Sequence, residues 1–524
     1  MADTTISFEP CRALEAHARL VMAWRNDPTT LAMSYHREPK VWDRFWPEYV
    51  GEYLRPTTSP GPVFVLADGE RIGFLRFRTV PHPRGLGGLT TDISINLAPR
   101  ARGRGLSAPA LRVALGYLRD LGVDAVHAEV RAGNTASLRA FELAGFETLG
   151  PARKRIADTG EDCDIVGFVA ELTSTFWRRR GVYVIAEAGS NWRMGTRARD
   201  LAMARTLIDV AVEAGADAVK FQTYRPETVY VSNAGKSDYL ADAGIQDEIG
   251  EIFADLSMPY DMIPEMAEYC RRAGIDFMST PFSPADFAAV DPHVPVHKIA
   301  SYEISHVHLI RLAARSGKPV VMSTGASVED DIAWAVKTFE DAGGKDLCLL
   351  QCTARYPAPV SSLNLLAIPW LRRRFGVASG FSDHSREPLT GPVVAAALGA
   401  RVIEKHYTLD NKLPGPDHAF AMTPAELAEM VRQVRLVGES LGDGVKTVLP
   451  DERELAAFAR RGLQATTAIS MGDVLREGSN FSILRPGQRR LGAHPRHLGH
   501  FEGRTATRTI GLGDGLSLED VPSG

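Results

Sequence analysis

Eight short apolar runs alternate with segments of helical periodicity between residues 182 and 408. Buried parallel strands read as continuous apolar runs, and a repeated strand-helix unit favours a closed (β/α)8 TIM barrel, an α/β fold. An open doubly wound sheet is the alternative, but no Gly-x-Gly-x-x-Gly turn follows a strand here, which counts against a dinucleotide-binding fold. The predicted strands are 182–188, 218–223, 277–281, 296–301, 320–325, 347–353, 378–384 and 402–408.

Charged and hydroxyl side chains stand at the ends of these predicted strands, where a parallel barrel carries its chemistry. A lysine or glutamate in an apolar strand is costly to bury without a partner, so a ring of them predicts a charged ligand. Lysines beside hydroxyls suit a phosphate and a carboxylate. These residues are Glu187, Lys220, Gln222, Thr280, Lys298, Ser301, Glu303, Ser323, Tyr356, Ser382 and Glu404.

Two histidines, His384 and His406, stand at the ends of the last two predicted strands, and an Ala/Gly/Val-rich helical segment, 389–400, joins those strands. Two neutral imidazoles from neighbouring strand ends suit a divalent metal. Two core histidines satisfied by their packing are the alternative. The carboxylates and lysines at the other strand ends favour the metal.

The first 175 residues have a different pattern. Two runs, 64–67 and 71–77, are separated by Asp68-Gly69-Glu70 and predict a hairpin. The alternating strand 91–97 is followed by a glycine-rich turn with Gly103 and Gly105, and then by a helix. Such a turn exposes backbone N–H groups at a helix N-terminus, which suits a pyrophosphate.

The turn reads Arg-x-x-Gly-x-Gly and is followed by Asn-x-x-Ser-x-x-x-aromatic and Gly-Phe, an order that resembles the GNAT acetyltransferase family. The resemblance implies acetyl-coenzyme A as a co-substrate. The residues it assigns to that cofactor are Arg100, Arg102, Gly103, Arg104, Gly105, Leu106 and Asn134. Many members have a tyrosine at Phe141 that protonates the leaving thiolate. Glu129 and His127 are the candidate bases for the acceptor amine, and an inactive spacer domain is the alternative.

The barrel segment resembles the sialic acid synthase family. The stretches that carry the resemblance, in family order, include Ile185-Ala-Glu-Ala-Gly, Val219-Lys-Phe-Gln-Thr-Tyr, His297-Lys-Ile-Ala-Ser-Tyr-Glu, Phe381-Ser-Asp-His-Ser and Ile403-Glu-Lys-His-Tyr. The resemblance implies condensation of phosphoenolpyruvate with an N-acyl-mannosamine-like sugar to give a nine-carbon sugar acid. His384 and His406 are then the ligands of Mn²⁺ or Mg²⁺ and act with Glu187 in catalysis. The implied substrate-binding residues are Lys220, Gln222, Thr280, Lys298, Ser301, Glu303, Ser323, Tyr356, Ser382, Asp417 and Arg485.

The last segment contains short β-like runs and turn signals, and resembles the small antifreeze-like (SAF) domain that follows the barrel in sialic acid synthases. By that resemblance Arg485 reaches the sugar in the barrel of a partner subunit, which implies a domain-swapped homodimer. The predicted domains are 1–175, 181–450 and 458–524. One departure from the family is Trp192, which stands where members usually have a histidine and puts the exact sugar in doubt.

The net charge of -4 gives no sign of a nucleic-acid partner, and no run of 18 apolar residues or signal peptide is read. Five scattered cysteines fit a reducing compartment, so we expect a cytoplasmic protein. The leading interpretation is a synthase fused to an amino-sugar N-acetyltransferase, with a legionaminate- or pseudaminate-type product. The alternatives are a pseudaminate-type synthase acting on a diacetamido-trideoxy-altrose, a plain N-acetylneuraminate synthase with an inactive GNAT domain, and a carbohydrate-binding scaffold without catalysis.

Overall fold

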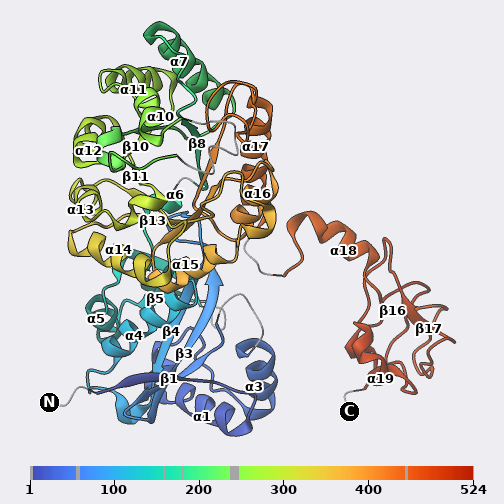
Figure 1. The fold of residues 1–524 in the computed structure, drawn as a ribbon. Coiled ribbons are helices and arrows are strands. Elements are labelled where there is room, and N and C mark those ends of the chain that lie inside the picture. The colour runs from blue at the N-terminus through green and yellow to red at the C-terminus, as the bar shows by residue number, and fades with distance from the viewer. Residues whose placement is uncertain are drawn as a thin grey trace. The chain divides into compact units, whose positions relative to one another are not determined.

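The computed structural model describes residues 4–54, 60–156, 160–179, 181–236, 247–442 and 446–522. The chain divides into two compact units, Met1–Gly444 and Val445–Gly524. The first unit contains a seven-stranded sheet and an eight-stranded parallel barrel whose helices surround the strands (Figure 1). Within the described ranges, no helix is both long and apolar enough to cross a bilayer.

The N-terminal sheet has the strand order β1-β2-β3-β4-β5-β7-β6. Its neighbours are antiparallel except β4 and β5, which are parallel and pair only through Thr90–Asp92 and Ala125–His127 before they separate. The elements are β1 (Ile6–Pro10), α1 (Glu15–Arg25), α2 (Pro28–Met33), α3 (Trp42–Glu48), η1 (Tyr49–Tyr53), β2 (Val63–Ala67), β3 (Glu70–Val80), β4 (Thr90–Leu97), η2 (Pro99–Ala101), α4 (Ser107–Asp120), β5 (Ala125–Arg131), α5 (Thr135–Leu143), β6 (Glu147–Arg155) and β7 (Asp162–Glu171).

The predicted hairpin is confirmed. Strands β2 and β3 pair antiparallel on either side of a two-residue turn formed by Asp68 and Gly69, with φ angles of 51° and 83°. Two consecutive positive φ angles match the right-handed twist of the flanking strands, and Asp-Gly adopts them at low cost.

The second sheet has eight parallel strands in the order β10-β9-β8-β15-β14-β13-β12-β11. The end strands β10 and β11 lie beside each other, so the sheet curls into a barrel, which confirms the predicted fold over the open sheet. The strands are β8 (Tyr183–Gly189), β9 (Ala218–Thr223), β10 (Asp276–Pro281), β11 (His297–Ile299), β12 (Val320–Ser323), β13 (Leu347–Cys352), β14 (Ala378–Asp383) and β15 (Val402–His406).

Helices follow the barrel strands. They are α7 (Arg197–Glu213), α8 (Pro226–Val229), α10 (Ile249–Leu256), α11 (Met262–Ala273), α12 (Pro284–Val290), α13 (Val307–Arg315), α14 (Glu329–Asp341), α15 (Ala367–Phe375), α16 (Thr390–Ala397) and α17 (Pro424–Ser440). The fourth strand was predicted over 296–301 but covers only His297–Ile299, because the 3-10 turn η4 (Ser301–Ser305) begins directly after it. Ser301 and Glu303 therefore belong to η4 and not to the strand.

The segment between the two sheets closes one end of the barrel. Its short helix α6 (Phe176–Arg179) buries Trp177 in a cluster with Tyr183, Met278 and Val402, residues at the beginnings or inner faces of the strands. Trp177 is 2% exposed, and its ring lies 6.1 Å from that of Tyr183. The opposite end of the barrel, where the strands finish, is therefore left for a site.

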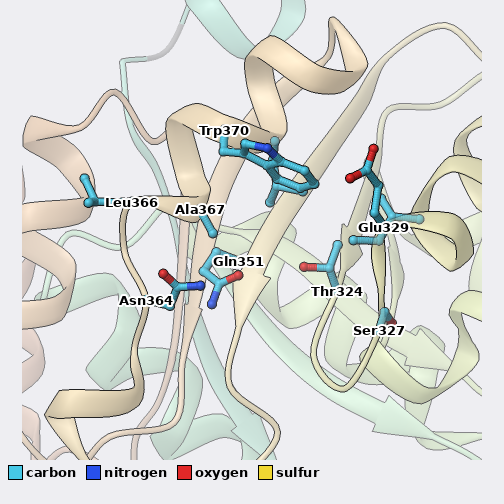
Figure 2. Close-up of a pocket in the computed structure, with 10 residues that line it drawn as sticks. Thr324, Ser327, Glu329, Gln351, Asn364, Leu366, Ala367 and Trp370 are labelled. Carbon is cyan, nitrogen blue, oxygen red and sulfur yellow. The ribbon is translucent and has the colours of Figure 1, made fainter.

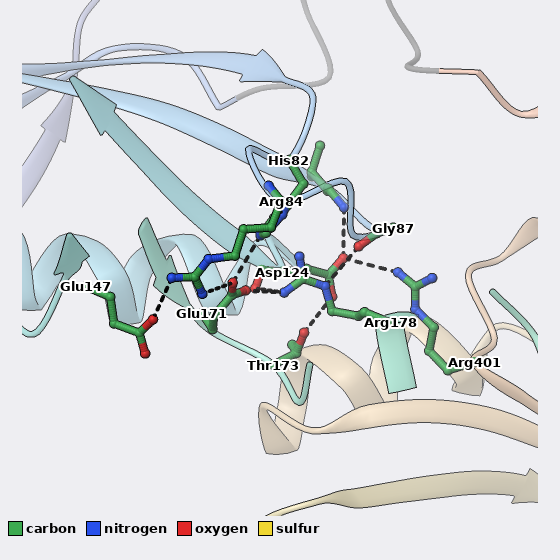
Figure 3. A network of polar contacts seen from close by, with 10 residues as sticks. His82, Arg84, Gly87, Asp124, Glu147, Glu171, Thr173, Arg178 and Arg401 are labelled. Atoms are coloured by element: carbon green, nitrogen blue, oxygen red, sulfur yellow. Dashed lines mark hydrogen bonds and ion pairs between the residues drawn. The ribbon is translucent and has the colours of Figure 1, made fainter. Parts of the chain in front are cut away.

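A polar network joins the N-terminal sheet to the beginnings of the barrel strands (Figure 3). Arg178 Nη1 lies 2.5 Å from Glu171 Oε2, and the same guanidinium donates to the carbonyl of Gly87 at 2.9 Å. Asp124 accepts from Thr173 Oγ1 at 3.0 Å and lies 3.6 Å from Arg401 Nη2. Arg178 is 2% exposed, so these ion pairs are shielded from solvent.

The second unit is small and mostly irregular. It contains α18 (Arg453–Ala459), the antiparallel pair β16 (Gly462–Ala465) and β17 (Phe481–Leu484), and α19 (Leu498–Phe501). Isolated bridges connect Ile469 to Ile510 and Val474 to Thr505. Its likeness to an antifreeze-like domain, and the three predicted domain boundaries, stay predictions.

Candidate active site

Two lysines and two glutamates form a buried network inside the mouth of the barrel. Lys220 Nζ lies 2.6 Å from Glu187 Oε2 and 3.6 Å from Glu404 Oε1, and Lys298 Nζ lies 3.8 Å from the same Glu404 oxygen. Hydroxyl groups complete the shell, because Lys220 donates to Thr280 Oγ1 at 3.0 Å and Lys298 to Ser323 Oγ at 2.7 Å. Glu404 is thus shared between two ammonium groups that come from different strands.

Burial and these charges set the protonation of the network. Burial raises the pKa of Glu187 to about 7, although the nearby Lys220 opposes the rise. Burial also acts to raise the pKa of Glu404, but Lys220 and Lys298 outweigh it and the pKa ends below its usual value. Glu404 is therefore the fixed anion of the network, and Glu187 is the carboxyl that can exchange a proton near neutral pH.

His384 and His406 meet beside this network, with their ring centroids 5.6 Å apart. Tyr356 stacks on His384 at 4.1 Å, and Phe420 lies 5.2 Å from His406. Burial lowers the pKa of His384 to about 4 and the pKa of His406 well below its usual value, so both imidazoles are neutral at physiological pH.

The histidines fit a divalent metal by their chemistry. His384 Nδ1 lies 3.0 Å from the carbonyl of Thr353, which can only accept, so Nδ1 carries the proton and Nε2 keeps a lone pair. Within the part of the chain that the structure describes, His406 Nδ1 is buried without a hydrogen-bond partner, and it lies 3.6 Å from Asp417 Oδ2. Among the described residues no group of three or more His, Cys, Asp or Glu side chains gathers as a ligand set.

Other predicted site residues line the same space. Gln222 donates to Glu187 Oε1 at 2.9 Å, and Ser382 donates to Glu404 Oε1 at 3.4 Å. Burial raises the pKa of Glu303 to about 7 and that of Asp417 to about 6. The structure therefore gathers polar side chains from several strand ends at one mouth.

Three positions add detail that the sequence did not reveal. Cys352 Sγ lies 3.7 Å from His384 Nδ1. Gly189 has φ of 51°, and a Cβ there would lie 2.8 Å from Asp417 Oδ2. Trp192 is 1% exposed and belongs to a hydrophobic cluster with Met203.

Arg485 lies in the second unit, directly after β17, and its side chain is exposed. Its predicted role at the sugar stays a prediction.

The predicted cofactor turn of the N-terminal domain leads into α4. Gly103 and Gly105 have φ of 72° and 71°, a left-handed conformation that glycine adopts without strain. The Arg102 guanidinium is already engaged, because it lies 2.5 Å from Asp27 Oδ2 and donates to Thr30 Oγ1 at 2.8 Å.

Two further positions that the sequence singled out, Asn134 and Phe141, belong to the cap and the interior of α5. Asn134 caps the helix by accepting from the Ser137 backbone N–H at 3.2 Å. Phe141 is buried and stacks on Phe168, with ring centroids 5.6 Å apart.

A separate cavity of about 440 Å³ lies at the outer side of β12 and β13 (Figure 2). Thr324, Gln351, Asn364 and Trp370 are among its lining residues, and neither histidine of the barrel mouth is.

Fold and site together define a (β/α)8 barrel enzyme with a charged, metal-competent mouth, fused to an acetyltransferase-like domain. The chain belongs to the NeuB family, whose model matches residues 207–446, and a model for the acetyltransferase (GNAT) domain matches residues 11–147. NeuB membership confirms the resemblance to sialic acid synthases, and the GNAT match confirms the resemblance of the N-terminal segment to acetyltransferases. The family match also fits a metal-dependent synthase, and the GNAT match fits a domain that binds acetyl-coenzyme A. Neither match identifies the metal.

Three similar proteins illustrate the family. The spore coat polysaccharide biosynthesis protein SpsE of Bacillus subtilis is 37% identical over 359 residues, 65% of this chain and 93% of that protein. A pseudaminic acid synthase of Campylobacter jejuni is 35% identical over 344 residues, 65% of this chain and 96% of that protein. The crystal structure of a putative spore coat polysaccharide biosynthesis protein E from Chromobacterium violaceum has 25% identity and a TM-score of 0.52, and covers 65% of this chain and 99% of that one.

Proposed function

We propose that the barrel condenses phosphoenolpyruvate with the open-chain aldehyde of an N-acyl-mannosamine-like sugar, releasing a nine-carbon sugar acid and phosphate. The observation that carries the proposal is the buried Glu187–Lys220–Glu404–Lys298 network, which lies in the same barrel mouth as two neutral histidines. The same mouth can therefore bind an anionic substrate and polarise a carbonyl group.

Lys220 and Lys298 bind the phosphate and carboxylate of phosphoenolpyruvate in this proposal. Both ammonium groups are buried, so their attraction for an anion is screened less by water than at a surface. Thr280 and Ser323, which already hydrogen-bond the lysines, add neutral donors to the same anion. This arrangement neutralises the substrate before reaction.

Glu187 accepts the proton of the water molecule that adds to the phosphate-bearing carbon. With a pKa of about 7 it takes that proton near neutral pH, and Gln222 holds its other oxygen. The phosphate then leaves with cleavage of its C–O bond.

His384 and His406 are the proposed ligands of Mn²⁺ or Mg²⁺. Bound there, the metal would supply Lewis-acid polarisation of the sugar aldehyde. Tyr356 and Phe420 flank the imidazoles and exclude water, and Asp417 faces His406. Glu303, Asp417 and Tyr356 are the proposed ligands of the sugar hydroxyls.

The test is phosphate release from phosphoenolpyruvate with a panel of N-acyl hexoses, with and without Mn²⁺, followed by mass spectrometry of the product. Metal-dependent phosphate release with one sugar and a nine-carbon acid as product supports the proposal. Silence with every sugar and metal would remove it.

A diacetamido-trideoxy hexose is the sugar we place first in that panel. The C. jejuni relative named pseudaminic acid synthase is similar along 96% of its length, and the fused acetyltransferase domain fits a substrate with a second acylated amine. A higher kcat/KM with N-acetylmannosamine would instead indicate a plain N-acetylneuraminate synthase.

The N-terminal domain is proposed to N-acetylate an amino-sugar precursor with acetyl-coenzyme A. The support is the match to the acetyltransferase model and the glycine turn that begins α4. Thiol release from acetyl-coenzyme A with a 4-amino-sugar nucleotide tests it, and silence across amino-sugar acceptors would favour a spacer role.

We further propose a homodimer in which Arg485 of one chain reaches the sugar held by the other. The exposed side chain of Arg485 after β17 is compatible with such a contact. The five cysteines are all unpaired thiols, which supports action in the reducing cytoplasm.

A further inference from the structure

Strands β4 and β5 of the N-terminal sheet form a fork. They pair in parallel only from Thr90–Ala125 to Asp92–His127, and beyond this point the ladder stops although both strands continue. The facing edges beyond the last pair therefore have backbone N–H and C=O groups free of the strand ladder. Such edges can take an extended ligand that carries amide groups, in the manner of an added strand.

The open end of the fork is tied to the predicted pyrophosphate turn. Arg102 Nε donates to the carbonyl of Leu97, the last residue of β4, at 3.3 Å. From Leu97 back to Asp92 is five residues, which spans roughly 17 Å in an extended strand. A pantetheine arm that starts at the turn and lies along β4 would bring its thioester to the closed end of the fork.

An aspartate and a histidine occupy that closed end. Asp92 and His127 are the last paired residues of the two strands, and His127 Nδ1 lies 2.9 Å from Asp92 Oδ1. Because the carboxylate accepts, Nδ1 carries the proton and Nε2 has the lone pair. Within the described residues nothing hydrogen-bonds to Nε2, and the side chain is 15% exposed, so a small amine can approach it.

The other candidate base is occupied. Glu129 lies two residues further along β5 on the same face, and its carboxylate is ion-paired with Lys154 of β6. The Lys154 ammonium also lies 4.7 Å from the centroid of the Tyr35 ring. The Glu129 carboxylate is therefore already paired with a cation, whereas His127 Nε2 has no partner among the described residues.

We propose that His127, positioned by Asp92, is the general base of acetyl transfer in the N-terminal domain, an inference that rests on the acetyltransferase function proposed above. The amine nitrogen bonds to the acetyl carbon as its proton passes to His127 Nε2, and the C–S bond breaks. The coenzyme A thiolate takes its proton from water, since Phe141 has no hydroxyl to give one. Asp92 is a positioning residue, because it reaches the reaction only through His127.

The kinetic test uses the full chain, acetyl-coenzyme A and a 4-amino-sugar nucleotide, with thiol release as the signal. His127→Ala should lower kcat about 10²- to 10⁴-fold, the usual worth of a general base, and added imidazole should restore part of the loss. Asp92→Asn should lower kcat about tenfold or more while KM for acetyl-coenzyme A stays unchanged. Glu129→Gln tests Glu129 as the alternative general base. Loss of turnover in Glu129→Gln, with His127→Ala still active, would overturn the proposal.

A second measurement tests the position and tautomer of His127 independently of acetyltransferase turnover. In protein labelled with ¹⁵N-histidine, the His127 resonance, identified by its absence in His127→Gln, should report a protonated Nδ1 that changes tautomer in Asp92→Asn. Saturating acetyl-coenzyme A should shift that resonance and leave the resonance of His308, exposed on α13, in place. A shift without turnover means that the acetyltransferase function fails. Binding of acetyl-coenzyme A that leaves His127 unmoved overturns the base assignment.

Discussion

Replacing Glu404 with glutamine tests the charge balance of the barrel mouth. Its Oε1 lies 3.6 Å from Lys220 Nζ and 3.8 Å from Lys298 Nζ, and all three side chains are at most 6% exposed. Each charge pair at this separation is worth about 4 kcal/mol at an effective dielectric constant of 20. Removing one partner of a buried pair typically costs about 3–5 kcal/mol after relaxation.

Glu404→Gln should therefore lower the melting temperature of the barrel by roughly 6–20 °C, measured by differential scanning calorimetry. The matched control is Glu268→Gln on α11, which removes a solvent-exposed partner of Arg271 and should leave the melting temperature in place. Phosphoenolpyruvate should stabilise Glu404→Gln more than it stabilises the wild type, because the ligand anion replaces the missing carboxylate between the two lysines. A variant that melts with the wild type, or responds less to phosphoenolpyruvate, would refute the reasoning.

Three further predictions concern the same mouth. Because burial raises the pKa of Glu187 to about 7, kcat should rise with pH through that value. Glu187→Gln should lose this pH dependence and lower kcat about 10²-fold or more. A pH profile that is unchanged in the variant would contradict the role of Glu187 as a base. Gly189→Ala brings a Cβ within 2.8 Å of Asp417 Oδ2 and should abolish turnover. The control is Gly195→Ala, which is also at positive φ but in open space and should retain turnover. Equal activities of the two variants would disprove the argument from the Asp417 contact. Arg485→Ala should raise KM for the sugar and leave KM for phosphoenolpyruvate unchanged. If neither KM differs between the wild type and the variant, the proposed contact of Arg485 with the sugar is excluded.

The barrel could be predicted from sequence because its strands are apolar on both faces and repeat with helices. Strand ends were less certain: the predicted strand ran over 296–301, yet β11 stops at Ile299 because the chain turns into η4. Only the fold shows that Trp177 closes the barrel beside Tyr183.

The candidate site was predictable by residue type but not by pairing. Lysines and glutamates in apolar strands indicated a buried charged site, whereas the sharing of Glu404 by Lys220 and Lys298 depends on strand order and register. Cys352 illustrates the same limit, since its approach to His384 follows from β13 and β14 being neighbours. A local motif likewise could not show that Arg102 is engaged by Asp27 and Thr30 at the start of α2.

The reaction of the barrel is tested most directly with phosphoenolpyruvate that carries ¹⁸O in its bridging C–O–P position, incubated with Mn²⁺ and the preferred N-acyl sugar. Cleavage of the C–O bond predicts that the label leaves with phosphate, detected by its ³¹P isotope shift, and that the product is an unlabelled nine-carbon acid. His406→Ala, with its fold verified by circular dichroism, should release no metal-dependent phosphate. Label retained in the organic product, or unchanged turnover in His406→Ala, would contradict the proposed chemistry.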